Sequence, residues 1–466
     1  MTSDATTDRR LAANGLPGLR RQTPLNRVVG SFEFWFLAAV TLIVIVGALY
    51  MWALMATDFP LRAEVAMDLD TEIIRRAAKW AAISAVPTAL LCIWADRWRP
   101  HRVWVWVLAL GWGAFVATPL SYEINTWMAG HLNVTGQLNP AAQARPAIFV
   151  APFVEEATKG TVLFWVAMAM RNRWIGLFSG VSLAGLSGAG FAFVENILYY
   201  ARALLFAAQN PGITPDKALW EIFKMRGLMS WFAHPLFTAM MGIGLAIALR
   251  TRSKTVRVIA PVAGFLSAAL LHMLFNGMAT VVAHGASLSA LLVFVAYPLV
   301  ALVVLLTCKQ IWFQKRIIAA RLGDFEKAGW LPASEVKASS EVFSRMYAFW
   351  QAFWGGRLIA TVRMQHTLIE LAYLRDSMLR GLVDDAGHLR ERALLARAVD
   401  LRARAIVAPW PHTSYPWKRW SDRRRARKAQ GRPVHSTPAT AAWSGPAPLG
   451  GPQYTPVDPS WKPPSA

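Results

Sequence analysis

The sequence is poor in charged residues and in cysteine. Asp, Glu, Lys and Arg make up 16% of the 466 residues, well below the share of about a quarter that is usual in soluble domains. Together with a hydrophobic content of 55%, this excludes an ordinary soluble fold. The chain has two cysteines, Cys92 and Cys308, which are too few for a disulfide framework and have no neighbour that indicates a metal pair.

The apolar residues of the sequence are concentrated in long blocks. Each block, of roughly 18 to 25 residues, is long enough to cross a hydrocarbon core about 30 Å thick, and only a helix satisfies its own backbone there. We therefore predict an all-α, polytopic membrane bundle of about eight transmembrane helices. The predicted spans are residues 32–56, 77–95, 103–120, 146–170, 174–200, 227–249, 256–282 and 288–308.

Basic residues alternate between the connections of these spans. They gather in the N-terminal arm 1–31, in the second, fourth and sixth connections, and after Cys308. The positive-inside rule then places both termini in the cytoplasm, as expected of a multi-pass protein of the plasma membrane. The same rule places the loop 121–145 on the extracytoplasmic side.

The chain changes character after residue 308. Residues 309–408 are polar with helical periodicity, which predicts a cytosolic helical hairpin or small bundle. Residues 409–466 are Pro-rich and basic, with too few apolar residues for a core, so we predict a disordered tail. Its basic run, residues 423–428, is expected to contact anionic lipid headgroups. The net charge of +22 needs no nucleic-acid partner, and none is expected.

Polar residues interrupt four of the predicted spans. A charged side chain at mid-span costs roughly 2.5 to 3.5 kcal/mol on insertion scales, so such residues usually mark a functional interior. Counted along the predicted spans, the four groups lie at a similar depth, roughly 7 to 15 Å below the extracytoplasmic surface, which favours a single site. The groups are Glu155, Glu156 and Lys159; Glu195 and Asn196; His234 and Thr238; His272 and Asn276.

The chemistry of this set suits hydrolysis of an amide. A carboxylate beside a second carboxylate, such as Glu155 beside Glu156, is a candidate general base for water. Imidazole and carboxamide N–H groups can stabilise an oxyanion. A set of one Glu with His234 and His272 would also suit zinc, but no His-Glu-x-x-His helix is present, so we favour a metal-free glutamate mechanism with zinc as the alternative.

These strings resemble the motifs of a known family. Glu155-Glu156-x-x-Lys159, Phe191-Ala192-x-x-Glu195-Asn196, His234-x-x-x-Thr238 and His272-x-x-x-Asn276 are similar to the four motifs of the PrsW family of intramembrane proteases, distant relatives of the CAAX-processing membrane proteases. The resemblance covers roughly residues 146–282. It implies a membrane-anchored protein substrate and a protease domain over residues 32–308, and it leaves metal dependence open. The catalytic set that it implies is Glu155, Glu156, His234, His272 and Asn276, supported by Lys159, Glu195, Asn196 and Thr238.

Other interpretations of the same residues remain. Intramembrane Glu and His also relay protons, so a proton- or ion-coupled transporter is the main alternative; a membrane scaffold with a structural polar cluster is a third. A single buried His or Asn more often joins two helices than acts as a catalyst. We expect solvated side chains at His101, His131 and His284, and close helix packing at Gly185, Gly188 and Gly190.

Overall fold

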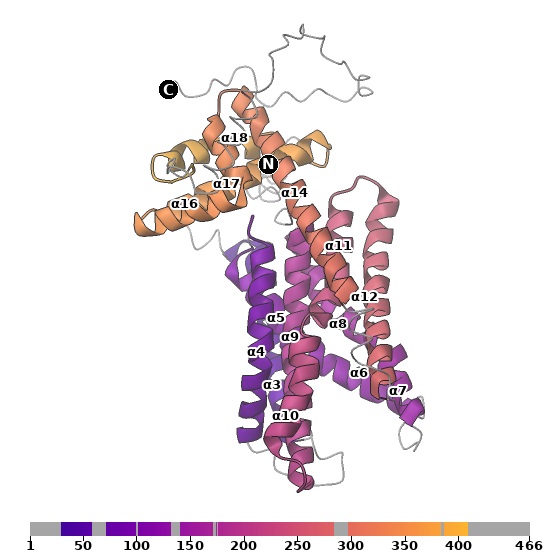
Figure 1. The fold of residues 1–466 in the computed structure, drawn as a ribbon. Helices are drawn as coiled ribbons and strands as arrows, with labels where there is room; N and C mark the ends of the chain where they lie inside the picture. Colours follow the sequence, from indigo (N-terminus) through magenta and orange to yellow (C-terminus); the bar gives the residue numbers. More distant parts are fainter. Residues whose placement is uncertain are drawn as a thin grey trace, which may run out of the picture. The chain divides into compact units, whose positions relative to one another are not determined.

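The computed structural model describes residues 29–57, 71–98, 101–131, 140–170, 174, 176–283, 297–383 and 386–408. Every element assigned among them is a helix, which confirms the all-α class for this part of the chain (Figure 1). The chain divides into two compact units, residues 1–304 and residues 305–466. The predicted tail 409–466 and most of the N-terminal arm lie outside the described residues.

The first unit is a bundle of helices, two of which contain a π-helical turn. Its elements are α3 (Phe32–Thr57), α4 (Thr71–Ala95), α5 (Val103–Trp112), η1 (Gly113–Ala117), α6 (Thr118–His131), α7 (Pro140–Phe149), α8 (Ala151–Ala169), α9 (Leu177–Gln209), α10 (Pro215–Phe223), η3 (Lys224–Met229), α11 (Ala233–Leu249) and α12 (Lys254–Ala283). Helix α14 (Tyr297–Lys327) begins in this unit and continues into the second one.

Six helical segments of the described chain are long and apolar enough to cross a membrane. They are Phe32–Met55, Thr71–Ala95, Val103–His131, Leu177–Gln209, Pro215–Leu249 and Lys254–Val281. Helix α8 is not among them because its 19 residues include three charged ones. The last predicted span, residues 288–308, lies partly outside the described residues. The number of eight spans therefore stays a prediction.

Several helices are longer than the apolar blocks that predicted them. Helix α9 continues to Gln209, nine residues beyond the expected end at Tyr200, because a residue such as Arg202 ends an apolar block without ending a helix. Glu195 is consequently fourteen residues from the end of α9 (209 − 195), where about five were expected. Depths counted from block ends are therefore wrong for this residue, and the site must be located from contacts.

Close packing around α9 brings the polar groups together. This helix packs against α4, α5, α8, α10 and α11. A Cβ atom added at Gly188 would lie 2.7 Å from His234 O, and one added at Gly190 would lie 1.9 Å from Leu110 O. Only glycine allows backbones to approach so closely, so the predicted packing role of the glycines in α9 is confirmed.

The expectation that His101 is solvated is wrong. Its side chain is buried, and Nδ1 lies 2.7 Å from Asp96 Oδ2. The same carboxylate oxygen accepts the His101 backbone N–H at 2.7 Å, and Ser179 donates to the other oxygen. A short polar connection can fold back on itself in this way, which its sequence did not show. His131 is exposed as expected, and His284 lies outside the described residues.

The second unit is a small helical domain built around α17. Its elements after α14 are α15 (Ala333–Ser340), α16 (Val342–Trp354), α17 (Leu358–Leu379) and α18 (Ala386–Arg402). Leu368, Ile369 and Leu371 of α17 are fully buried. Ion pairs join the helices, among them Arg402 with Glu335 at 2.8 Å and Arg321 with Asp376 at 3.4 Å.

Candidate active site

The predicted site residues come from four helices that meet inside the first unit. Glu155, Glu156 and Lys159 lie on α8, Glu195 and Asn196 on α9, His234 and Thr238 on α11, and His272 and Asn276 on α12. Pro152 and Pro235 lie in the first turns of α8 and α11, where a proline lacks no helical hydrogen bond. The two glutamates and His234 therefore lie at helix beginnings.

Glu156 is surrounded by donors. Its side chain is fully buried, and Oε1 accepts a hydrogen bond from Lys159 Nζ at 2.7 Å. His272 Nδ1 lies 3.0 Å from the same oxygen, while Thr238 Oγ1 donates to Oε2 at 2.8 Å. A carboxylate with both oxygens engaged is held in one orientation.

Glu155 is the opposite case. Its Oε2 is buried but accepts no hydrogen bond from the part of the chain that the structure describes. Lys159 Nζ lies 3.6 Å away and His272 Nε2 3.8 Å away, both beyond hydrogen-bond distance. A buried carboxylate oxygen that lacks a donor is costly, so this atom marks the place where another group is expected to bind.

His234 also contacts a second group of polar residues, which lie on α9 and η3. His234 Nε2 lies 2.8 Å from Glu195 Oε2, and Arg226 Nη2 donates to the same oxygen at 2.7 Å. Arg226 Nε also donates to Asn196 Oδ1 at 2.9 Å, so one guanidinium orients both polar residues of α9. Its ring-face contact with Tyr199, at 3.8 Å from the centroid, holds it in place.

Sequence reasoning missed Arg226. It precedes the sixth apolar block by one residue and so was assigned to a loop. The sequence does contain a signal for the helix that carries it, because Thr214 followed by Pro215 and Asp216 is a typical helix start. In the structure Thr214 caps α10 through its side chain, and the helix continues as η3, on which Arg226 lies.

Lys159 is the cation at the centre of the site. Its Nζ lies 3.1 Å from His234 Nδ1 and 4.1 Å from the centroid of the Phe191 ring. The side chain is fully buried, so its carboxylate neighbours and the ring face take the place of water. This contact also explains the phenylalanine of the second motif.

The charges of the site do not balance. Glu155, Glu156 and Glu195 contribute three carboxylates, whereas Lys159 and Arg226 contribute two cations. With neutral imidazoles the cluster has one excess negative charge, and an uncompensated charge in a buried place is expensive. A bound cation or a shared proton would remove the excess.

Three of these residues fit a metal ion by their donor atoms. Glu155, His234 and His272 each offer one ligand atom, and these atoms all lie within 4.8 Å of one another. Each imidazole has a carboxylate on one ring nitrogen, Glu195 for His234 and Glu156 for His272, while the other nitrogen of His234 contacts Lys159 Nζ. One carboxylate and two imidazoles supported by outer carboxylates are the usual donor set of a catalytic zinc, and the bare Oε2 of Glu155 is the atom that such an ion would satisfy.

Asn276 lies one turn beyond His272 on α12. Its Nδ2 donates to Ala147 O at 2.8 Å, in α7 just ahead of α8. This bond ties α7 to α12, whereas the other predicted residues are joined through the carboxylates. Of the catalytic set, the recorded contacts bring Glu155, Glu156, His234 and His272 together and place Asn276 at the edge.

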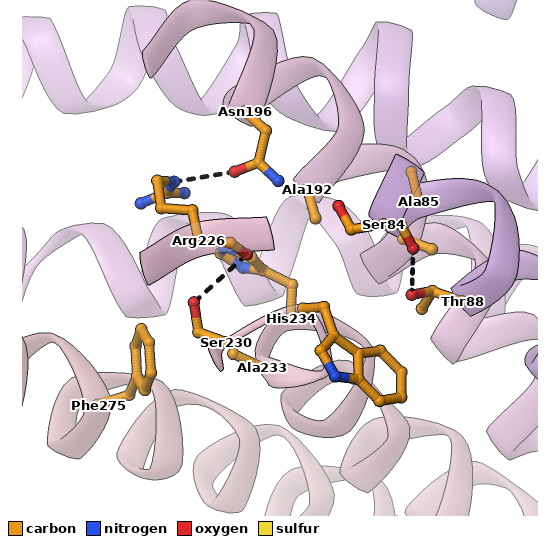
Figure 2. A pocket seen from close by; sticks show the side chains of 12 residues that line it. Ser84, Ala85, Thr88, Ala192, Asn196, Arg226, Ser230, Ala233, His234 and Phe275 are labelled. Atoms are coloured by element: carbon orange, nitrogen blue, oxygen red, sulfur yellow. Dashed lines mark hydrogen bonds between the residues drawn. The ribbon is translucent and has the colours of Figure 1, made fainter. Parts of the chain in front are cut away.

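A hollow opens beside His234. Its empty volume, open solvent included, is about 400 Å³. Figure 2 shows Arg226, Asn196 and Ser230 on one side of it and Ser84 and Thr88 of α4 on the other. Glu155 and His272 are not part of this lining, so the hollow borders the site at His234, Asn196 and Arg226.

The family comparison matches residues 101–303 to the PrsW family, which is described as a family of intramembrane metalloproteases. The matched range includes all four helices of the site. No curated protein and no solved structure matches the chain.

Proposed function

Because residues 101–303 match the PrsW family of intramembrane proteases, we propose that this multi-pass membrane protein hydrolyses a peptide bond of a membrane-anchored protein with a water activated beside Glu155. The observation that carries this assignment is the contrast between the two adjacent glutamates. Glu156 has both oxygens engaged, whereas Glu155 Oε2 accepts no hydrogen bond within the described chain. Only Glu155 has an oxygen available for chemistry.

We also propose that Glu155, His234 and His272 hold a zinc ion, in agreement with the family's description as metalloproteases. A zinc ion in such a set supplies Lewis acidity and lowers the pKa of water. This proposal replaces the metal-free mechanism favoured from sequence. The three donor residues lie on three different helices, so no residue spacing within one helix indicates a metal site in the sequence.

The remaining residues then act by positioning and by balancing charge. Glu156 accepts a hydrogen bond from Nδ1–H of His272, and Glu195 accepts one from Nε2–H of His234. The opposite nitrogen of each ring is thereby left unprotonated. That of His272 lies 3.8 Å from Glu155 Oε2, whereas that of His234 is contacted by Lys159 Nζ at 3.1 Å, so a metal ion would have to replace this lysine contact. Lys159 compensates the two glutamates of its own helix, and Arg226 fixes Glu195.

Asn276 receives a structural role in addition to the one that the resemblance implies. Its Nδ2 carries two N–H groups, and one of them donates to Ala147 O. Through this bond Asn276 holds α7 against α12 and so fixes the beginning of α8, while its second N–H is left to face an oxyanion. Its loss should therefore displace Glu155 as well as remove a donor.

The position of cleavage follows from the predicted orientation. With both termini in the cytoplasm, α8 begins near the extracytoplasmic side, and Glu155 is its fifth residue. Scission is therefore expected near the outer end of a substrate helix. A helical peptide bond is shielded by its neighbouring turns, so the substrate should contain a weakly helical or already unwound segment there.

The transporter alternative gains no support from the family comparison. A proton relay would use the same carboxylates but would produce no new protein ends. The two functions are separated by comparing the membrane proteins of cells that make the natural chain with those of cells that make Glu155→Gln. The proposal expects new N-termini in or beside transmembrane segments in the first cells alone. Identical termini in both, with a pH change across vesicles that hold the natural chain, would refute it.

A further inference from the structure

Helix α16 in the second unit exposes one apolar face. Five large side chains, exposed by between 53% and 81%, form what we call the aromatic face. They recur at intervals of three, four, three and one residues and so lie within an arc of about 100° of the helix. The members are Phe343, Met346, Trp350, Phe353 and Trp354.

The opposite side of α16 packs against the rest of the second unit. Ala348 and Ala352 are fully buried, and Arg345 is nearly so. The aromatic face is therefore not a poorly packed core, because the helix already has a buried side. Exposed apolar surface of this extent usually meets a partner or a membrane.

The chain itself determines where α16 begins relative to the membrane. Helix α14 runs without a break from Tyr297 to Lys327, through the predicted end of the last span at Cys308. Lys315 of α14 forms an ion pair at 3.7 Å with Glu341, the residue that precedes α16. Seven residues separate Cys308 from Lys315, which is roughly 10 Å of helix. With the last span ending at Cys308 as predicted, the start of α16 is expected at about the level of the headgroups.

Side chains around this level have the composition of a membrane interface. Trp312 and Phe313 of α14 are exposed, and the Arg316 guanidinium carbon lies 4.5 Å from the centroid of the Trp312 ring. Trp residues with neighbouring basic residues are typical of the water–lipid boundary. Residues 305–408 contain sixteen Lys and Arg against ten Asp and Glu, a net charge of +6, which suits an anionic surface.

We propose that α16 lies in the cytosolic headgroup layer of the bilayer, with its aromatic face inserted among the acyl chains. Interfacial helices of this kind bury their apolar side by about 5 to 10 Å. The docked helix would restrain the second unit at the membrane surface independently of the basic tail. The proposal concerns a lipid surface and does not depend on the proposed proteolysis.

Nitroxide labels can test this in the complete chain. Cys92 and Cys308 are replaced by serine, and a single cysteine is introduced by Trp350→Cys or, separately, by Trp354→Cys. Glu326→Cys is the matched control, since Glu326 is exposed on α14 but lies eighteen residues beyond Cys308, roughly 27 Å along the helix. Each labelled chain is reconstituted into vesicles of phosphatidylcholine and phosphatidylglycerol, and collision with oxygen and with a water-soluble nickel chelate is measured.

The proposal expects labels at 350 and 354 to collide with oxygen several-fold more, relative to nickel, than the label at 326. High nickel access at 350 and 354 would place α16 in water and overturn the proposal. Low access to both reagents would show that protein covers the face, which also overturns it. Spin–spin broadening that disappears on dilution with unlabelled chain would identify a second copy as the partner, again against a lipid surface.

Discussion

Replacing Glu155 and Glu156 one at a time by glutamine should separate catalysis from stability. Glu156→Gln removes the charge that Lys159 Nζ contacts at 2.7 Å, with both side chains fully buried. Breaking one partner of a buried ion pair usually costs about 3 to 5 kcal/mol, because the other charge is left uncompensated. The two further bonds to His272 and Thr238 would also be disturbed.

Glu155→Gln should affect stability much less. Its Oε2 accepts no hydrogen bond in the described chain, and Lys159 lies 3.6 Å away. We expect a smaller loss than for Glu156→Gln, because no hydrogen bond to Oε2 is given up and Lys159 keeps its contact with Glu156 at 2.7 Å. Activity should nevertheless be abolished, because the carboxylate that is proposed to face the water or the metal ion is lost. For Glu156→Gln, loss of activity should follow loss of the folded state.

Thermal unfolding in detergent, together with cleavage of a membrane-anchored substrate, measures both effects. A change of 3 to 5 kcal/mol corresponds to a lower Tm by roughly 6 to 20 °C for a domain of this size. Equal unfolding temperatures of the two variants, or a lower Tm for Glu155→Gln than for Glu156→Gln, would contradict the different roles of the two glutamates. Zinc content of the same samples checks the ligand assignment, with about one equivalent expected in the natural chain and little in Glu155→Gln.

Three shorter predictions concern other parts of the molecule. Gly188→Val should lower activity and folded yield, because its Cβ would lie 2.7 Å from His234 O and must displace the start of α11; normal activity in membranes would contradict this packing. A cysteine placed in residues 132–139 should react with an impermeant thiol reagent in intact cells, as the predicted extracytoplasmic position requires, and protection there would reverse the orientation. Burial raises the pKa of Glu391 to about 7. The folded state therefore keeps a proton that the unfolded state releases above about pH 4.5. The free energy of unfolding of the second unit should fall by up to about 3 kcal/mol as the pH rises from 4.5 to 7. Hydrogen exchange of α18 amides, corrected for intrinsic rates, should show this loss, and Glu391→Gln should abolish it; an unchanged slope in that variant would disprove the assignment.

The sequence predicted the residues of the site better than their contacts. A charged residue inside an apolar block is visible without any structure, which is why the groups on α8, α9, α11 and α12 could be named. Arg226 was missed because the pattern that defines a span ends where polar residues begin, although the helix continues. Element ends such as that of α9 at Gln209 were missed for the same reason.

The difference between the two glutamates could not be predicted at all. Glu155 and Glu156 are the same residue type at adjacent positions, and only the surrounding helices decide which of them meets Thr238. The sequence named one Glu with His234 and His272 as a possible zinc set, but which glutamate lies near the two imidazoles depends on how three helices pack. These features depend on tertiary packing. A single sequence shows the glycines that permit close packing, but not the contacts that result from it.

The distribution of the donor residues also has a consequence for biosynthesis. Glu155 and His272 are separated by 117 residues (272 − 155), so ribosomes that add about 5 to 20 residues per second need roughly 6 to 23 s between them. During this interval a chain with α8 already in the bilayer still lacks α12, which carries His272. On the proposed site, a chain that has not yet inserted α12 should be inert toward neighbouring membrane proteins, and insertion of α12 would be the activating step.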